Sequence, residues 1–288
     1  MHWILMTALV PCLIASTACS GPPPTDEPPD DEYGVEQQEE PVVGGKPDKA
    51  DPAVVALDLG GEGWCSGALI GPRTVLTARH CVSYTTGSYV CPADEPQTFG
   101  ERPPGSIRVL VGYDTRKATV VARGVRIVVP PEPVLCEQDI ALVVLDQNVP
   151  GITPLAVRRD VPPAYGELLR VVGYGKRGDH KAGGKKYTRP GVQVTWVGVS
   201  EFTVGEAVCN GDSGGPAIDR LGAVVGVVSA GGDTCEGVDA WGLYTRVDAF
   251  GALIDQALNV EAGRPCGSGK RCPNGLHCSP QRICVPAS

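Results

Sequence analysis

The sequence predicts an all-β protein of the barrel or sandwich type with one helix near its C-terminal end. Short apolar or alternating stretches recur along the middle of the chain, and Gly or Pro separates them. The 288 residues include 38 Gly and 27 Pro but only 5% aromatics, which favours strands and tight turns over helices. Helical spacing of apolar residues stands out in one late segment, so strands dominate the expected fold.

The predicted strands are residues 53–59, 107–111, 118–129, 140–145, 168–174, 192–199 and 223–228. Residues 83–105 are rich in Gly and Pro, which predicts a long surface loop, and loops of this length are often functional. After Asp248, a candidate N-cap, apolar residues recur at helical spacing. They are Phe250, Leu253, Ile254, Ala257 and Leu258.

The N-terminal end predicts export. Residues 3–14 are mostly apolar, too few to span a bilayer, and small residues follow, which indicates a signal peptide over 1–18. Cleavage before Cys19 would expose a cysteine, as in bacterial lipoproteins attached to a membrane. Free secretion after the same cut is the alternative. Either way, the protein is expected at the cell surface or outer membrane, or secreted.

Residues 19–41 are expected to form an acidic, proline-rich tether or propeptide, because they carry eight acids and no Lys or Arg. The whole chain has 25 Lys+Arg and 33 Asp+Glu, a formal net charge of −8. The remainder is therefore neutral overall. A nucleic-acid partner, which requires a basic face, is not expected.

Cysteine usage indicates disulfides. Apart from Cys12 and Cys19, the chain has ten cysteines, and an even number behind an export signal implies pairing. Zinc binding is the alternative, but the spacing contains no CxxC pair. We therefore expect no metal and no cofactor.

Three segments combine residues suited to acyl transfer: Leu76–Cys81 with His80, Asp139–Leu142, and Cys209–Pro216 with Ser213. A serine hydroxyl needs a base such as histidine, and a carboxylate must hold the imidazole in one tautomer. The developing oxyanion needs fixed N–H donors, and glycines around the serine allow the backbone to supply them. Taken singly, the histidine could be an ordinary surface or core residue, the Asp139 segment the start of a buried strand and the glycine-rich segment a turn. Together they indicate a nucleophilic serine.

With these segments and several shorter motifs, the chain resembles the chymotrypsin/trypsin family of serine endopeptidases over about 220 residues, from Val42 to about residue 260. The shorter motifs are Val42–Gly45, Trp64–Gly67, Gly173–Gly175 and Tyr244–Val247. The resemblance implies two six-stranded antiparallel β-barrels with the site between them and a short C-terminal helix. The protease domain would span 42–261, followed by a small disulfide-rich module over 262–288.

The resemblance also implies roles. Ser213 would be the nucleophile, His80 the base and then the acid, and Asp139 the orienting carboxylate supported by Ser229. The N–H groups of Gly211 and Ser213 would form the oxyanion hole. The protein would then be a serine endopeptidase that cleaves proteins or peptides through an acyl-enzyme. The alternatives are a non-catalytic binding protein on the same fold and a protein switched on by a partner.

Two disulfides follow from the same resemblance, Cys65–Cys81 and Cys209–Cys235. Cys91 and Cys136 would then pair, provided that the tail cysteines pair among themselves. Those four are Cys266, Cys272, Cys278 and Cys284. They allow three pairings and must replace a core in so short a segment. This module would be a small binding module or a stable cap.

Activation departs from the family pattern. In the family, cleavage after Arg or Lys frees an α-amine that pairs with the acid before the nucleophile, here Asp212. Glu40 and Pro41 precede Val42, and the first Lys or Arg of the chain is Lys46. Either an activating protease of non-tryptic specificity cuts at Pro41–Val42 and frees the domain from its tether, or the enzyme works without this ion pair.

The primary specificity pocket is expected to be apolar. Ala207 stands where trypsin-like enzymes carry a pocket-floor Asp, and Val208 follows it, while Gly231 and Gly242 would line the walls. Burying an unpaired ammonium or guanidinium there would be costly. Cleavage is therefore predicted after medium-sized apolar or aromatic residues and not after Lys or Arg.

Overall fold

The structure is a computed structural model that describes residues 42–85, 97–259, 277–278 and 284–285. All of these belong to one compact unit, Glu39–Ser288. The predicted signal peptide, the tether with its candidate lipidation site Cys19, and most of the cysteine-rich module lie outside the described residues. The boundaries expected between these parts stay predictions.

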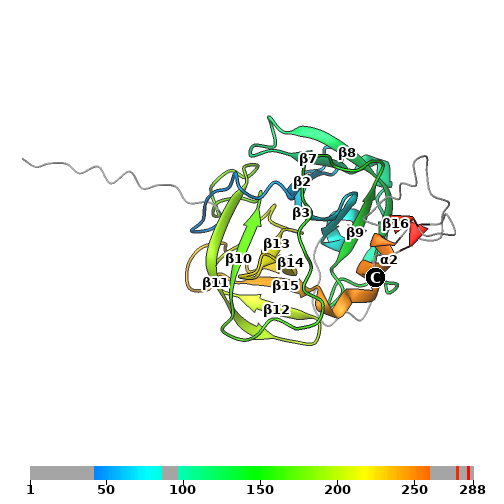
Figure 1. Cartoon of the computed structure of the whole chain (residues 1–288). Helices are drawn as coiled ribbons and strands as arrows, with labels where there is room; N and C mark the ends of the chain where they lie inside the picture. The colour runs from blue at the N-terminus through cyan, green and yellow to red at the C-terminus, as the bar shows by residue number, and fades with distance from the viewer. Residues whose placement is uncertain (1–41, 86–96, 260–276, 279–283, 286–288) are drawn as a thin grey trace, which may run out of the picture. The chain divides into compact units, whose positions relative to one another are not determined.

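Six antiparallel strands close into the first barrel in the order β2-β3-β4-β9-β8-β7 (Figure 1). They are β2 (Val54–Asp58), β3 (Trp64–Gly71), β4 (Thr74–Thr77), β7 (Arg108–Val111), β8 (Thr119–Val128) and β9 (Ala141–Leu145). All five residues of β9 and four of the five in β2 are buried. One face of these strands fills the barrel interior and the other packs against neighbouring parts of the domain, so both faces are apolar.

The second barrel contains β10 (Leu168–Gly173), β11 (Tyr187–Val197), β12 (Glu201–Val204), β13 (Pro216–Ile218), β14 (Val224–Gly231) and β15 (Gly242–Arg246). Pairing of β11 with β12 closes these six strands, and β1 (Lys46–Pro47) adds to the edge of β11. The stacked rings of Phe202 and Tyr244, 5.0 Å apart, lie in its core. The predicted all-β, two-barrel fold is confirmed.

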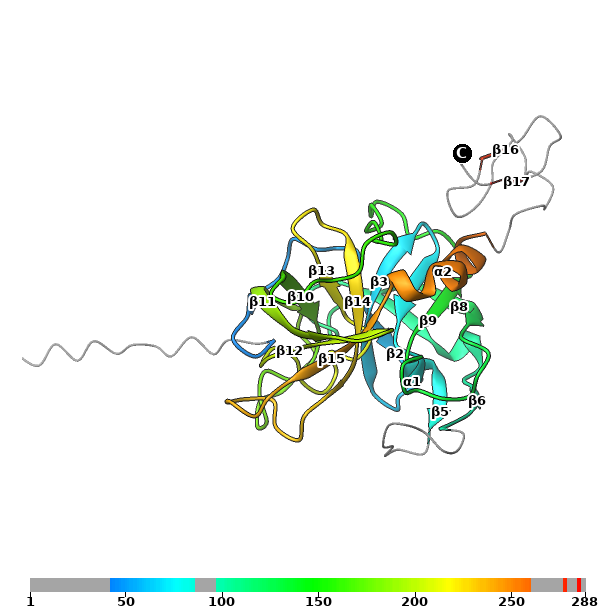
Figure 2. The same ribbon diagram turned by 90° about the horizontal axis from the view of Figure 1, so that it is seen from below.

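The two barrels lie side by side (Figure 2). The backbone N–H of Ser66 on β3 donates to the carbonyl oxygen of Ser213, just before β13, over 2.8 Å. The hydroxyl of Tyr174, at the end of β10, donates to the carbonyl of Val54 on β2 over 3.3 Å. These bonds join the barrels where the predicted catalytic segments meet.

The predicted helix is α2 (Gly251–Leu258), preceded by a 3₁₀ turn at η2 (Asp248–Phe250). Ile254 and Ala257 are its buried residues, as the helical spacing requires. The prediction of Asp248 as N-cap was wrong. Its carboxylate accepts two hydrogen bonds from the Arg246 guanidinium instead, because a charge-assisted pair two residues away outcompetes a cap.

The expected long loop over 83–105 is partly regular. It contains the antiparallel pair β5 (Ser83–Thr85) and β6 (Thr98–Glu101) and a 3₁₀ turn, η1 (Pro104–Ser106), while residues 86–96 are not described. The short pair β16 (His277–Cys278) and β17 (Cys284–Val285) is what the structure describes of the C-terminal module.

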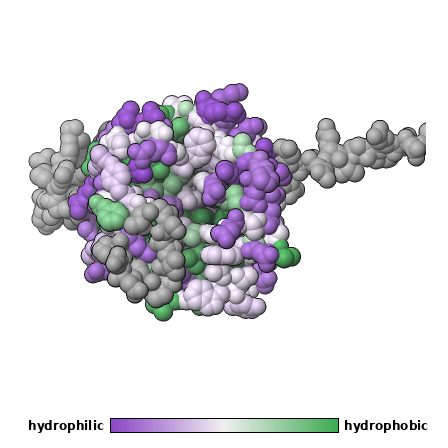
Figure 3. Space-filling model, turned by 180° about the vertical axis from the view of Figure 1, so that it is seen from behind, coloured by the Kyte–Doolittle hydropathy of each residue, from purple (hydrophilic) through white to green (hydrophobic). Residues whose placement is uncertain are grey.

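Within the described ranges, no helix is both long and apolar enough to cross a membrane. In Figure 3, apolar side chains lie at the centre of the face shown, and hydrophilic side chains lie above them and to their right.

Candidate active site

His80 and Asp139 are brought together by the register of two first-barrel strands. Thr77, the last residue of β4, pairs with Ala141, the first residue of β9. His80 lies in the short helix α1 (Arg79–Val82) that follows β4, and Asp139 lies just before β9. Strand pairing therefore places both side chains at the same edge of the barrel.

The imidazole and the carboxylate make two contacts. His80 Nδ1 lies 2.7 Å from Asp139 Oδ2, and the backbone N–H of His80 donates to Oδ1 over 2.9 Å. Burial opposes the charged imidazole, but the Asp139 carboxylate outweighs it and holds the pKa of His80 above its ordinary value. The Nδ1 contact assigns the proton to that nitrogen, which leaves Nε2 as the acceptor.

Asp139 is fully buried and held by the second barrel as well. Its Oδ2 accepts a 2.7 Å hydrogen bond from the Ser229 hydroxyl, and its carbonyl oxygen accepts one of 3.0 Å from Thr245 Oγ1. Ser229 lies on β14 and Thr245 on β15, so both barrels fix this carboxylate. The arrangement matches the support expected of Ser229.

Arg79, next to the histidine, is a residue that sequence reasoning missed. Its buried guanidinium donates to the carbonyl of Glu132 and, over 3.4 Å, to that of Val134, and lies 3.6 Å from Glu101. Burial lowers the pKa of Arg79, and Glu101 and Asp139 oppose this effect. Arg79 therefore ties the histidine helix to the segment that leads into Asp139.

Ser213 lies on a tight loop before β13, shaped by two glycines in the left-handed region. Gly211 has φ +98° and Gly214 has φ +77°. A Cβ at Gly214 would overlap the hydroxyl of Thr77, so only glycine fits there. No hydrogen bond joins Ser213 to His80 among the described residues, and such contacts commonly tighten only when substrate binds.

Both peptide groups that flank Gly211 are held by outside donors. The Asn210 carbonyl accepts a 2.8 Å bond from the Lys176 N–H. The Gly211 carbonyl accepts a 2.9 Å bond from the Ser66 hydroxyl. Because the N–H of Gly211 is trans to the Asn210 carbonyl, it points away from Lys176 and can serve as a donor to an oxyanion.

The role of Ser66 is a second feature missed from the sequence. Its side chain is fully buried, and its Oγ also accepts a 2.9 Å hydrogen bond from the Tyr174 N–H. The residue stands in the Trp64–Gly67 motif, but nothing in the motif indicates a partner 145 positions away.

Asp212, directly before Ser213, is buried and has backbone partners. Its Oδ1 accepts a 2.8 Å bond from the Gly175 N–H and its Oδ2 a 3.0 Å bond from the Cys209 N–H. Burial raises the pKa of Asp212 to about 7, although these two bonds act in the opposite direction. No described cation forms an ion pair with this carboxylate.

Val42, expected to supply the activating α-amine, is 2% exposed and packs in the core of the second barrel with φ +44°. In the uncleaved chain its nitrogen is a peptide nitrogen, so it carries no charge to pair with Asp212. In the uncleaved chain Asp212 is held by its two backbone bonds, and the ion pair expected after cleavage stays a prediction.

Two disulfides brace this region. Cys65 is bonded to Cys81 beside His80, and Cys209 to Cys235 beside Ser213, with Cα–Cα distances of 6.2 and 5.2 Å. Cys136 is also disulfide-bonded, and Cys91 lies outside the described residues. Two clusters of potential metal ligands occur among the described residues, one at Cys65, His80 and Cys81 and one at Asp179, Cys209 and Cys235. Each contains both cysteines of a disulfide, and disulfide sulfurs are not the thiolates that bind metals.

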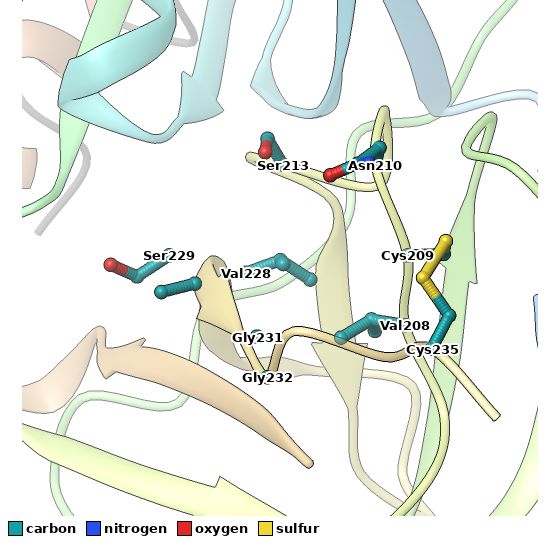
Figure 4. A pocket seen from close by; sticks show the side chains of 10 residues that line it. Val208, Cys209, Asn210, Ser213, Val228, Ser229, Gly231, Gly232 and Cys235 are labelled. Carbon is teal, nitrogen blue, oxygen red and sulfur yellow. A yellow bond between two sulfur atoms is a disulfide. The ribbon is translucent and has the colours of Figure 1, made fainter. Parts of the chain in front are cut away.

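A pocket opens beside Ser213 (Figure 4). Its lining residues are Val208, Cys209, Asn210, Ser213, Val228, Ser229, Ala230, Gly231, Gly232 and Cys235. None of them is charged. Ala207 and Gly242 are not among them. Ala207 packs in the barrel core, and a Cβ at Gly242 would lie 2.6 Å from Val208 Cγ2. Val208 therefore occupies the space that Gly242 leaves open.

Comparison with known proteins identifies the family. The trypsin family model matches residues 42–254. Serine protease SP24D of Anopheles gambiae is 33% identical over 224 residues, which cover 72% of this chain and 76% of that protein. Snake venom serine protease 3 of Protobothrops jerdonii is 27% identical over 263 residues, covering 80% and 92%. The chain belongs to the trypsin family.

Solved structures agree on the fold. Neuropsin, a serine protease expressed in the limbic system of mouse brain, superposes with a TM-score of 0.59 at 19% identity, covering 75% of this chain and 99% of its own. HBP gives a TM-score of 0.61 at 23% identity, covering 75% and 96%. At these identities the likeness shows the fold alone. The family and the disulfides indicate an extracellular serine protease.

Proposed function

We propose that this chain is a serine endopeptidase that hydrolyses peptide bonds through an acyl-enzyme. The observation that carries the proposal is the buried Asp139 carboxylate, which makes three contacts and lies 2.7 Å from the imidazole of His80. An imidazole oriented in this way accepts a proton on Nε2, which is the requirement for activating a serine hydroxyl.

In the proposed reaction, Ser213 Oγ attacks the scissile carbonyl carbon while His80 Nε2 takes the hydroxyl proton. The N–H groups of Gly211 and Ser213 stabilise the negative oxygen of the tetrahedral intermediate. His80 then gives its proton to the leaving amine, the C–N bond breaks, and an ester to Ser213 remains. Water, deprotonated by His80, hydrolyses that ester and restores the serine.

The proposed substrates carry a medium-sized aliphatic residue on the acyl side of the scissile bond. The pocket beside Ser213 has no charged lining residue, so a Lys or Arg side chain would lose hydration without meeting an opposite charge in the lining. Glu206, two residues before Val208, instead accepts a 2.6 Å bond from the Gly237 N–H and lies 3.3 Å from Arg189. Because Val208 narrows the pocket, Val or Leu fits better than Phe or Tyr.

Export and anchoring belong to the same proposal. The disulfides support an oxidising compartment, and Cys19 is the proposed lipidation site that attaches the acidic tether to a membrane. Activation by cleavage would require a protease that cuts at Pro41–Val42, since no Lys or Arg precedes Val42. That protease is the proposed activating partner.

The test is the intact mass of the exported protein before and after a fluorophosphonate probe. One stoichiometric adduct, absent in Ser213→Ala, is expected. The same spectrum reports whether the chain begins at Cys19, with or without lipid, or at Val42. A chain that begins at Val42, remains folded and takes up no probe would instead be a non-catalytic binding protein.

A further inference from the structure

Positive charge is concentrated on two neighbouring segments, 113–117 and 176–186. Together they hold seven Lys or Arg and two Asp, whereas the chain as a whole is acidic. Lys186 is buried and turns inward to the carbonyls of Asp51 and Val54. The other six, with Lys49, form what we call the basic face: Lys49, Arg116, Lys117, Lys176, Arg177, Lys181 and Lys185.

Backbone bonds hold the two segments together. Thr115 N–H donates to the Gly184 carbonyl and Lys186 N–H to the Tyr113 carbonyl, each over 2.8 Å, and Asp114 forms a β-bridge with Lys185. Lys49 joins the same face, because its Nζ lies 5.7 Å from the centre of the Tyr113 ring. The cations are therefore spatially grouped on an ordered part of the fold.

The two acids within these segments are already engaged. Asp114 accepts bonds of 3.0 and 2.8 Å from the Arg116 guanidinium. Asp179 accepts a 2.7 Å bond from Thr234 Oγ1 and a 2.9 Å bond from the Cys235 N–H. Asp114 also acts electrostatically on Lys185, and Lys181 Nζ lies 3.8 Å from Glu236 Oε1. The seven cations of the basic face still outnumber these three acids, so the face carries an excess of positive charge.

The basic face begins at the oxyanion loop. Lys176 donates its N–H to Asn210, directly before Gly211. A Cβ at Gly184 would lie 3.0 Å from the Trp64 ring, and one at Gly211 would lie 3.4 Å from Trp64 Nε1. Trp64, which is 41% exposed, therefore bridges the segment 176–186 to the loop that holds Ser213.

The opposite charge borders the specificity pocket. Gly232 and Cys235 line the pocket, and the loop 232–239 that contains them carries three exposed acids and no Lys or Arg. A substrate whose acyl-side residue fills this pocket must continue, after the scissile bond, past Trp64 and away from the pocket. The leaving part of the substrate then runs along the basic face.

We infer that this protease favours substrates with acidic residues C-terminal to the scissile bond. The inference rests on the proposed function, since it assigns the pocket to the acyl side and the basic face to the leaving side. Charges of opposite sign across a cleft raise the encounter rate and select among partners, and salt weakens both effects.

The experiment compares two internally quenched peptides with the full chain. Both carry the same acyl side ending in Val, followed by Gly-Asp-Glu-Asp in one and Gly-Asn-Gln-Asn in the other. At about 20 mM salt, where screening is weak, we expect kcat/KM to be about tenfold higher for the acidic peptide, falling towards equality at about 0.5 M. Equal values at low salt, or a preference that salt does not change, would overturn the inference.

Charge variants assign the effect to the basic face. Lys49→Gln/Lys117→Gln/Lys185→Gln should abolish the preference and leave cleavage of the neutral peptide unchanged. The matched control neutralises three exposed cations elsewhere, Arg123→Gln/Arg126→Gln/Arg220→Gln, and should keep the preference. A preference that survives the first triple variant, or is lost equally in the second, contradicts the assignment.

A binding measurement separates this inference from the proposed function. The leaving-side product Gly-Asp-Glu-Asp, labelled at its C-terminus, is titrated with the Ser213→Ala chain and followed by anisotropy. We expect salt-sensitive binding that is lost in the basic-face triple variant on the same background. If neither peptide is cleaved by the wild-type chain, the proposed catalysis fails while this titration still decides the inference.

Discussion

The hydroxyl of Ser66 donates a 2.9 Å hydrogen bond to the carbonyl oxygen of Gly211, across 145 positions of the chain. It thereby connects the first barrel to the loop whose N–H groups are the proposed oxyanion donors. The same oxygen accepts the Tyr174 N–H, so one buried hydroxyl joins β3, the end of β10 and the oxyanion loop. The orientation of Gly211 therefore depends on a side chain outside the predicted triad.

Removing this hydroxyl should impair catalysis more than substrate binding. In Ser66→Ala, we expect kcat to fall about tenfold with KM nearly unchanged, because the oxyanion donor loses its fixed orientation. The free energy of unfolding should fall by about 1–3 kcal/mol, since the Tyr174 N–H is left without a partner. Steady-state kinetics and urea unfolding measure the two effects.

Tyr174→Phe is the matched control for that experiment. It removes a buried hydroxyl that donates to Gly112 and Val54 but leaves the Tyr174 N–H bond to Ser66 in place. We expect a comparable loss of stability with kcat unchanged. Equal losses of kcat in both variants would show that Ser66 acts only through general stability.

The pH profile should report the contact between His80 and Asp139. The imidazole must be neutral to accept the serine proton, and Asp139 holds the pKa of His80 above its ordinary value. We therefore expect kcat/KM to fall as pH is lowered through an apparent pKa above about 6.5. In Asp139→Asn, activity should fall by a factor of about 10⁴. An acid limb unchanged in pKa in Asp139→Asn would contradict the assignment.

Asp212 should make the stability of the uncleaved chain pH-dependent. Burial raises the pKa of Asp212 to about 7, above the unfolded value near 4. A carboxyl whose pKa is raised by folding stabilises the folded state fully at a pH below its pKa in the unfolded chain. That stabilisation is lost as the pH rises through its pKa in the folded chain. We therefore expect the uncleaved chain to lose a few kcal/mol of unfolding free energy between about pH 4 and 8.

The Asp212→Asn variant provides the reference for that measurement. An amide can accept only one of the two N–H bonds, so the variant should be less stable at low pH. Its stability should nevertheless vary less with pH, and this slope is the decisive quantity. A slope equal to that of the wild type would rule out Asp212 as the source.

The size of the specificity pocket should depend on Val208. Val208→Ala removes two methyl groups from the pocket wall. We expect the ratio of kcat/KM for an acyl-side Phe to that for Val to rise about tenfold, since one or two methylene groups change specificity by about this factor in an apolar pocket. Gly242→Ala should act in the opposite direction, because the new Cβ would lie 2.6 Å from Val208 Cγ2 and press it into the pocket. A panel of peptides that differ in the acyl-side residue measures both, and a wild-type preference for Arg would refute the apolar pocket.

Local patterns were sufficient for much of the fold. Each predicted strand overlaps an observed one, because apolar residues that repeat between Gly and Pro leave few other ways to bury them. The helix of residues 251–258 was predicted in the same way, from apolar residues that recur at helical spacing. The expected N-cap at Asp248 was wrong because the competing partner, Arg246, is a matter of side-chain geometry.

The sequence by itself determined the candidate catalytic residues, since His80, Asp139 and Ser213 stand in recognisable local motifs with the required functional groups. Tertiary structure alone decided how they are held. Strand register set the 2.7 Å contact of His80 with Asp139, and two barrels meeting in space gave Ser66 its bond to Gly211. Charge followed the same division: the acids and bases outside the tether cancel in the sequence, but folding groups cations on the basic face and acids on the adjoining loop 232–239. Hydrogen bonds and charges act through distance in space, which spacing along the chain does not reveal.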